Sequence, residues 1–196
     1  MIRIIGGAWG GRRLETPSGD ATRPAADAFR GRVINILGPD LSGTRVLDLF
    51  AGSGAFGLEC LSRGAILAVM VERARRAVEV IRRNVAALAP EEGAAVVVPG
   101  DVYRLALAVR ERGPYDIVFV APPYPHFRSE RAGLAALVST LADPALLAAD
   151  GVVVVQSATG DFATVPHPGL VADDVRAMGR TDFTFLRRGG APTARS

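Results

Sequence analysis

The chain has 196 residues, of which 49% are hydrophobic and 22% charged, and its only cysteine is Cys60. This composition favours a packed core over an expanded, disordered chain, and one cysteine excludes a disulfide framework or a multi-cysteine zinc site. No apolar run has the length of a membrane span and no signal-peptide core follows the start. We therefore expect a soluble, cytoplasmic protein, by default a monomer.

The positive charge is concentrated near the N-terminus. Residues 1–32 hold six arginines and three acidic residues, whereas the rest of the chain holds 17 of each. An apolar start and glycine pairs at 6–7 and 10–11 predict a short hairpin here. A basic segment on a neutral body indicates a polyanion partner, most simply nucleic acid, with a solvated tail as the alternative.

Further along, short apolar runs alternate with segments of helical periodicity. Continuous apolar strands between helices predict an α/β fold with a doubly wound, mostly parallel sheet, whose ligands bind at the carboxyl ends of the strands. We expect a basic extension over 1–26, the main domain over 27–188 and a tail over 189–196. The predicted helices cover 27–37, 58–63, 74–88, 102–112 and 131–141. The predicted strands cover 45–50, 66–71, 94–98, 116–120 and 151–156, with one or two more in 171–188.

A glycine-rich turn follows the first of these strands. Gly52, Gly54 and Gly57 form a GxGxxG pattern, and Glu72 lies 20 residues beyond Gly52, at the end of the next strand. This spacing fits a dinucleotide fingerprint, in which the acid binds ribose hydroxyls. Asp48 argues for another ligand, because a carboxylate inside the strand is poorly placed beside a pyrophosphate and well placed for an ammonium group or ordered donors.

The composite 48–54, Asp-Leu-Phe-Ala-Gly-Ser-Gly, resembles motif I of the S-adenosylmethionine-dependent methyltransferases. The resemblance implies that the loop lies against the methionine part of this cofactor. It also implies that Glu72 takes the ribose hydroxyls and that Asp101, after the third strand, reaches the adenine amine. The cofactor-binding residues implied are Asp48, Phe50, Ala51, Gly52, Ser53, Gly54, Glu72, Arg73, Asp101 and Val102.

The fourth strand ends in the corner Ala121-Pro122-Pro123-Tyr124. Two prolines make this corner rigid and extended. It resembles the (Asp/Asn)-Pro-Pro-Tyr motif of methyltransferases that modify exocyclic or amide nitrogens. In that motif a side-chain oxygen and a proline carbonyl accept the N–H groups of the target, and the aromatic ring stacks on a flipped-out base. The four residues of the corner are the implied catalytic group.

Ala121 departs from this motif, because it supplies no acceptor. Losing one such preorganised partner typically costs about 10²–10³ in rate. Three interpretations stay open at this point: an inactivated variant, an enzyme with another acceptor, or a protein that binds RNA and cofactor with little turnover. Two further function classes are a non-catalytic RNA-binding module and an NAD(P)-dependent oxidoreductase.

The whole chain resembles the RsmD-type bacterial 16S rRNA guanine-N2 methyltransferases. This implies methyl transfer from S-adenosylmethionine to the N2 of a guanine in 16S rRNA or the 30S subunit, with RNA engaged by the N-terminal segment. The resemblance also leads us to expect acids where Gly31 and Gln156 stand, and Phe in place of Ile34. The matching stretches are 3–7, 11–14, 22–24, Asp27 with Arg30, 35–37, 46–63, Asn84 and 122–124. The implied RNA-binding residues are Arg3, Arg12, Arg13, Arg23 and Arg30.

Overall fold

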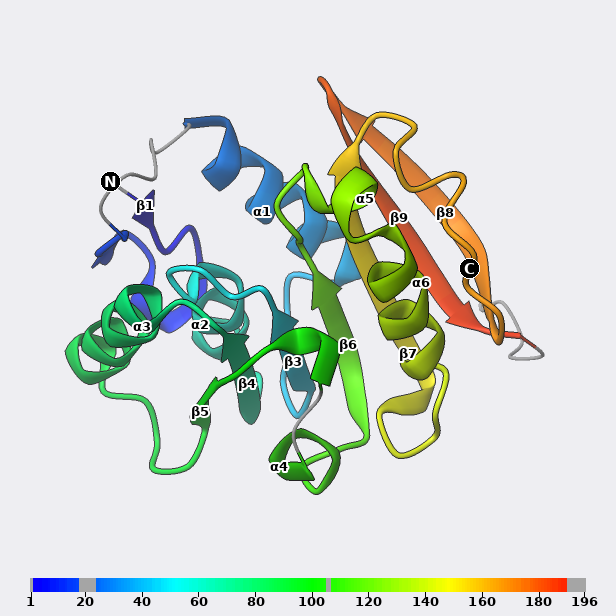
Figure 1. Cartoon of the computed structure of the whole chain (residues 1–196). Helices are drawn as coiled ribbons and strands as arrows, with labels where there is room; N and C mark the ends of the chain where they lie inside the picture. The colour runs from blue at the N-terminus through cyan, green and yellow to red at the C-terminus, as the bar shows by residue number, and fades with distance from the viewer. Residues whose placement is uncertain (1, 18–23, 105–106, 190–196) are drawn as a thin grey trace. The chain divides into compact units, whose positions relative to one another are not determined.

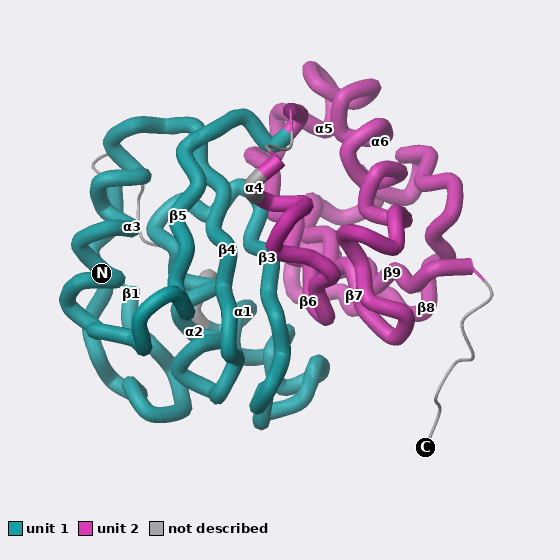
Figure 2. The backbone as a smooth tube through the Cα atoms, turned by 90° about the horizontal axis from the view of Figure 1, so that it is seen from below, with its two compact units in different colours: residues 1–102 teal, residues 103–196 magenta. Residues whose placement is uncertain are grey.

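A computed structural model describes residues 2–17, 24–104 and 107–189 (Figure 1). The chain groups into two compact units, residues 1–102 and residues 103–196 (Figure 2). Each unit is described by itself below. None of the helices in the described part of the chain is both long and apolar enough to cross a membrane.

Unit 1 contains three parallel strands in the order β5-β4-β3. Met70 in the middle strand packs under the helix 55–62 and its N-cap, since a Cβ on Gly57 would lie 2.9 Å from its Cγ and one on Gly54 would lie 3.0 Å from its Sδ. This helix therefore covers the middle strand at close range. The elements are α1 (Pro24–Leu37), β3 (Arg45–Leu49), α2 (Ala55–Ser62), β4 (Leu67–Glu72), α3 (Arg75–Leu88) and β5 (Ala95–Pro99).

The first residues of unit 1 form the predicted hairpin. Strands β1 (Ile2–Arg3) and β2 (Arg13–Leu14) pair in antiparallel fashion around the 3₁₀ turn η1 (Gly7–Trp9). Gly7 has φ +75°, and a Cβ there would lie 1.8 Å from the carbonyl oxygen of Ser62 on α2. Residues 2–17, here called the arm, are thus an ordered part of unit 1 and not a solvated tail.

Unit 2 has the strand order β6-β7-β9-β8, with β6 and β7 parallel and the last two pairings antiparallel. With the parallel strands of unit 1, this confirms the predicted α/β fold with a mostly parallel sheet. The elements are η2 (Val102–Arg104, which begins at the last residue of unit 1), α4 (Leu107–Arg110), β6 (Tyr115–Val120), α5 (His126–Ser129), α6 (Arg131–Thr140), β7 (Leu147–Ala158), β8 (Leu170–Met178) and β9 (Thr181–Arg188).

The predicted continuous helix over 102–112 is wrong. The chain forms the short turn η2 and the four-residue helix α4 in its place. A β-branched valine and a tyrosine at the start have modest helix propensity, and the Gly113-Pro114 pair stops the helix soon after Arg110. The remaining predicted elements are present, with ends that mostly differ by up to three residues.

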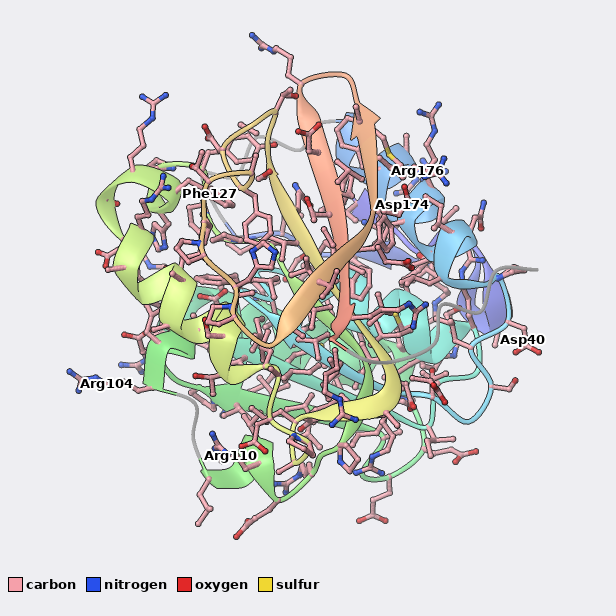
Figure 3. The ribbon with its side chains drawn as sticks, turned by 90° about the vertical axis from the view of Figure 1, so that its right-hand side faces the viewer. Asp40, Arg104, Arg110, Phe127, Asp174 and Arg176 are labelled. Atoms are coloured by element: carbon pink, nitrogen blue, oxygen red, sulfur yellow. The ribbon has the colours of Figure 1, made fainter. Side chains whose placement is uncertain are left out.

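Strand β8 lies at the edge of the unit 2 sheet. Val171 and Val175 on this strand are 57% and 54% exposed. Its pairing with β9 contains an irregularity between Ala172 and Asp174. The labelled side chains of Asp174 and Arg176 lie close to each other on this strand (Figure 3), and their ion pair measures 2.6 Å.

Candidate active site

Three acidic residues lie at or near the carboxyl ends of neighbouring parallel strands in unit 1. The registers Leu49 to Val71 and Val71 to Val98 align the ends of β3, β4 and β5. Asp48 lies inside β3, Glu72 ends β4, and Asp101 follows β5 after Gly100. This edge of a parallel sheet is where α/β proteins bind their ligands.

The loop between β3 and α2 has left-handed backbone at three positions: Phe50 (φ 64°), Gly52 (φ 57°) and Gly54 (φ 77°). Gly54 is packed tightly, because a Cβ would lie 3.1 Å from Ile81 Cγ2 as well as close to Met70. At Gly52 the opposite holds, since a Cβ would meet no atom within 4 Å. The loop is therefore anchored at Gly54 and leaves open space at Gly52, as a ligand that approaches the backbone requires.

Glu72 fastens this loop to the next helix. Its Oε2 accepts a hydrogen bond from the Gly52 amide at 2.9 Å, and its Oε1 accepts one from the Ala74 amide at 2.8 Å. The Glu72 carbonyl also accepts a hydrogen bond from the Gly100 amide at 3.0 Å. A carboxylate has about four lone-pair sites, so each oxygen keeps room to accept a ligand hydroxyl.

Asp48 is buried, with 2% of its surface exposed, and points at the start of α2. Its Oδ2 accepts a hydrogen bond from the Gly57 amide at 3.1 Å. Gly54 at the N-cap has no side chain to cap the helix, so Asp48 satisfies one of the free amides of the first turn. Burial raises the pKa of Asp48 to about 7, helped by the Glu72 charge and opposed by the Gly57 hydrogen bond and by Arg30.

This shift makes stability depend on pH. The pKa of Asp48 rises from its ordinary value of 3.8 to about 7 on folding, so the folded chain keeps a proton that the unfolded chain releases. The contribution of Asp48 to stability is complete below about pH 4 and is lost as the pH rises to about 7. Urea unfolding between these pH values should show Asp48→Asn gaining stability relative to the unsubstituted chain as the pH increases. A difference that stays constant across this window would contradict the assignment.

Asn84 on α3 joins the loop to the arm. Its Nδ2 donates to the carbonyl of Ser53 at 2.9 Å and to the carbonyl of Glu15 at 3.0 Å, while its Oδ1 accepts from the Glu15 amide at 2.8 Å. The side chain is buried, with 2% exposure. The side-chain amide of Asn84 therefore fixes the position of both the glycine-rich loop and the arm.

Glu59 on α2 is an anchor that the sequence reasoning missed. It is fully buried and accepts hydrogen bonds from the amides of Ile5 (2.7 Å) and Gly6 (2.9 Å) in the arm. Arg63 Nε lies 3.1 Å from its Oε1, and Arg30 Nε lies 3.6 Å from its Oε2. The available signal was a lone charged residue within the otherwise apolar segment 55–61.

The predicted RNA-binding arginines differ in their surroundings. Arg3, Arg12 and Arg13 are exposed on the arm, and Arg12 donates a 2.5 Å hydrogen bond to the carbonyl of Ala87. Arg30 has only 8% exposure and donates to the Arg3 carbonyl, so it holds the arm and does not present its guanidinium to solvent. Arg23 lies outside the described residues.

In unit 2, the corner after β6 turns directly into α5. The carbonyl of Pro123 accepts from the His126 amide at 2.9 Å, and the Tyr124 hydroxyl lies 3.0 Å from Thr181 Oγ1 on β9. Among the described residues, none donates to the carbonyl of Pro122. The corner thus fixes the tyrosine ring and leaves one backbone acceptor available.

His126 belongs to the helix that follows this corner. It begins α5, is 9% exposed, and its Nδ1 lies 3.1 Å from the hydroxyl of Tyr103. The two rings also stack, with centroids 6.2 Å apart. In the part of the chain that the structure describes, no three His, Cys, Asp or Glu side chains are grouped so that they could hold a metal ion.

The other predicted cofactor residues lie around the same strand ends of unit 1. Phe50 and Asp101 are half-buried, Ala51 and Ser53 are nearly buried, Arg73 is exposed directly after β4, and Val102 is buried. The Ala51 amide donates to the Val71 carbonyl at 3.0 Å, which ties the loop to β4.

Solved structures share this fold over almost the full chain. A chain from Escherichia coli described as a candidate methyltransferase matches with a TM-score of 0.76 at 33% identity, covering 95% of this chain and 97% of that one. A hypothetical protein of Thermus thermophilus matches with a TM-score of 0.73 at 28% identity, covering 95% and 99%. The fold and the loop at the strand ends define an α/β methyltransferase.

Sequence comparison resolves the class further. The family model described as conserved hypothetical protein 95 matches residues 2–187. The ribosomal RNA small subunit methyltransferase D of Escherichia coli is 37% identical over 167 residues, which are 85% of this chain and 80% of that protein. The chain belongs to the RsmD family, as its motifs indicated. This membership favours a methyltransferase over the NAD(P)-dependent oxidoreductase.

Proposed function

We propose that this chain transfers a methyl group from S-adenosylmethionine to the exocyclic N2 of a guanine in 16S rRNA of the small ribosomal subunit, in the bacterial cytoplasm. The observation that carries the proposal is the 37% identity, over 85% of the chain, to a protein described as ribosomal RNA small subunit methyltransferase D. The site geometry in the two units supports the same chemistry.

The residues of unit 1 fit this cofactor. Gly52 and Gly100 flank Glu72, and a Cβ at either glycine would meet no atom within 4 Å, so the backbone there is open to a ligand. Glu72 would hold the ribose hydroxyls on its remaining lone pairs, and Asp101 would hold the adenine amine. The loop 50–54 would lie along the methionine part. When bound, S-adenosylmethionine supplies a methyl group activated by a positively charged sulfur.

The corner in unit 2 would hold the base. The lone pair of a guanine N2 is delocalised into the ring, and hydrogen bonds accepted from its N–H groups localise it for attack. The Pro122 carbonyl would accept one N–H, and the Tyr124 ring, fixed through Thr181, would stack on the base. The contribution of these residues is positioning and electrostatics.

The arm would supply the phosphate contacts. Arg3, Arg12 and Arg13 are exposed on one ordered hairpin, and arginine suits bidentate phosphate binding. Arg30 is assigned to the arm's support and not to RNA. Contacts of this kind predict that affinity for RNA falls as salt concentration rises.

The direct test is methyl transfer with radiolabelled S-adenosylmethionine to 30S subunits and to naked 16S rRNA, followed by mass spectrometry of the labelled nucleoside. The expected product is N2-methylguanosine at one position. Labelled methyladenosine would contradict the specificity. No transfer to either substrate, by this chain and by Ala121→Asn alike, would contradict the function.

A further inference from the structure

The motif position occupied by Ala121 lacks the acceptor that the proposed chemistry uses. This residue directly follows β6 and is half-buried. The question is whether another side chain of unit 2 supplies an acceptor at the same place. The inference below rests on the proposed function.

The strand register identifies the neighbour of Ala121. Strands β6 and β7 are parallel, with Val118, Phe119 and Val120 paired to Val153, Val154 and Val155. The pairs end at Val120, the last residue of β6, and extending the same register by one step sets Ala121 beside Gln156. Neighbouring strands lie about 4.8 Å apart and paired residues point to the same face, so Gln156 stands on the face from which the Ala121 side chain projects.

The antiparallel neighbour β9 shows that Tyr124 uses this face too. Gln156 pairs with Phe183 and Ala158 pairs with Thr181. Residues two apart on a strand share a face, so Gln156 and Thr181 lie on the same side of the sheet. Thr181 Oγ1 is the atom that lies 3.0 Å from the Tyr124 hydroxyl. Gln156 therefore stands on the face over which the tyrosine is held.

The amide of Gln156 is available for a ligand. Gln156 is half-buried. Within the described residues, no side chain or backbone group makes a hydrogen bond with the side-chain amide of Gln156. The residues before it, Val153 to Val155, are fully buried valines of the same strand. Because the residue is only half-buried, this polar side chain at the end of an apolar run can be reached by water or by a ligand.

We propose that Gln156 is a catalytic residue of this chain and that its Oε1 replaces the missing acceptor at position 121. It would accept one N–H of the exocyclic amine while the Pro122 carbonyl accepts the other. In the step so assisted, a bond forms between N2 and the methyl carbon, and the carbon–sulfur bond of the sulfonium donor breaks with its electron pair passing to sulfur. After the transfer, the methylated N2 carries one proton too many. This proton goes to water, because the neutral side-chain amide of Gln156 cannot act as a base.

The test compares Gln156→Leu, Ala121→Asn and the double variant in methyl transfer to the RNA substrate. Gln156→Leu should lower kcat by about 10²-fold, since it removes one preorganised hydrogen-bond partner. Adding Ala121→Asn should restore at least about a tenth of the rate, because it returns an acceptor to the neighbouring position. Gln156→Glu keeps an acceptor oxygen and should stay within about tenfold of the unsubstituted chain.

Controls separate catalysis from folding. Thr184→Val removes a hydroxyl from the opposite face of the same sheet, at the residue paired with Val155, and should keep its rate within about threefold. Calorimetry should give the same Kd for S-adenosylmethionine in all variants. RNA with inosine in place of the target guanosine lacks the 2-amino group. The unsubstituted chain should bind guanosine RNA several-fold more tightly than inosine RNA, and Gln156→Leu should reduce this preference, because only the Pro122 carbonyl would then accept from the 2-amino group.

The outcomes are distinguishable. Loss of rate in Gln156→Leu with recovery in the double variant supports the inference. An active unsubstituted chain whose Gln156→Leu variant keeps its rate overturns the inference and leaves the proposed function standing. An inactive chain that Ala121→Asn makes active also overturns the inference. If neither methylates RNA, the proposed function itself fails.

Discussion

Replacing Glu59 with alanine should lower the free energy of unfolding by about 3–5 kcal/mol, because the change strands buried charges. The two guanidinium groups beside this carboxylate, Arg30 and Arg63, have side-chain exposures of only 7% and 10%. The Ile5 and Gly6 amides would also lose their acceptor. Urea unfolding at neutral pH measures the loss.

Release of the arm has its own spectroscopic signal. Trp9 is the only tryptophan of the chain. Its backbone amide donates a 2.9 Å hydrogen bond to the hydroxyl of Ser62, which lies on the same helix as Glu59. We expect the emission of Trp9 in Glu59→Ala to shift to longer wavelength under conditions where the rest of the chain stays folded.

Glu79→Ala is the matched control for Glu59. This residue also forms an i,i+4 ion pair with an arginine, but the side chains are 49% and 94% exposed. Its removal should change stability by less than about 0.5 kcal/mol. If Glu59→Ala and Glu79→Ala lost the same free energy of unfolding, burial of Glu59 would not account for its contribution to stability.

Replacing Glu72 with alanine should weaken S-adenosylmethionine binding by about 100-fold, as expected when hydrogen bonds to a charged group are lost. Two effects combine. The variant loses the proposed acceptor of the ribose hydroxyls, and it also loses the carboxylate that joins the Gly52 and Ala74 amides. Titration calorimetry with S-adenosylmethionine and S-adenosylhomocysteine measures the change.

Two further variants sharpen this experiment. Glu72→Gln keeps one side-chain oxygen and should lose about tenfold in affinity. Glu92→Ala removes an exposed carboxylate from the turn between α3 and β5 and should leave the Kd unchanged. If Glu72→Ala bound the cofactor within threefold of the unsubstituted chain, the assignment of the cofactor to this strand end would be wrong.

The sequence predicted the fold well wherever a local pattern determines an element. The apolar run 117–120 became the buried part of a strand, and the glycine pairs of the arm predicted its hairpin. The segment 102–112 failed, because periodicity does not register the low helix propensity of its first residues.

The candidate site was predictable only in part, because strand ends are visible in a sequence and long-range contacts are not. Asp48, Glu72 and Asp101 could be placed at adjacent strand ends from order alone. The hydrogen bonds from the arm to Glu59 join residues more than 50 positions apart in the sequence. The placement of Gln156 beside Ala121 depends on the register of β6 against β7. Both follow from tertiary packing, which no local pattern encodes.

The edge strand β8 has a consequence for how the molecule behaves at high concentration. An unpaired strand edge with exposed valines is a template for edge-to-edge aggregation. The pairing of β8 with β9 shifts register between Ala172 and Asp174, and β8 also carries the charges of Asp173, Asp174 and Arg176. A second chain that added a strand here would have to desolvate these charges. We expect this desolvation cost to disfavour self-association at the edge, although Val171 and Val175 are exposed to solvent.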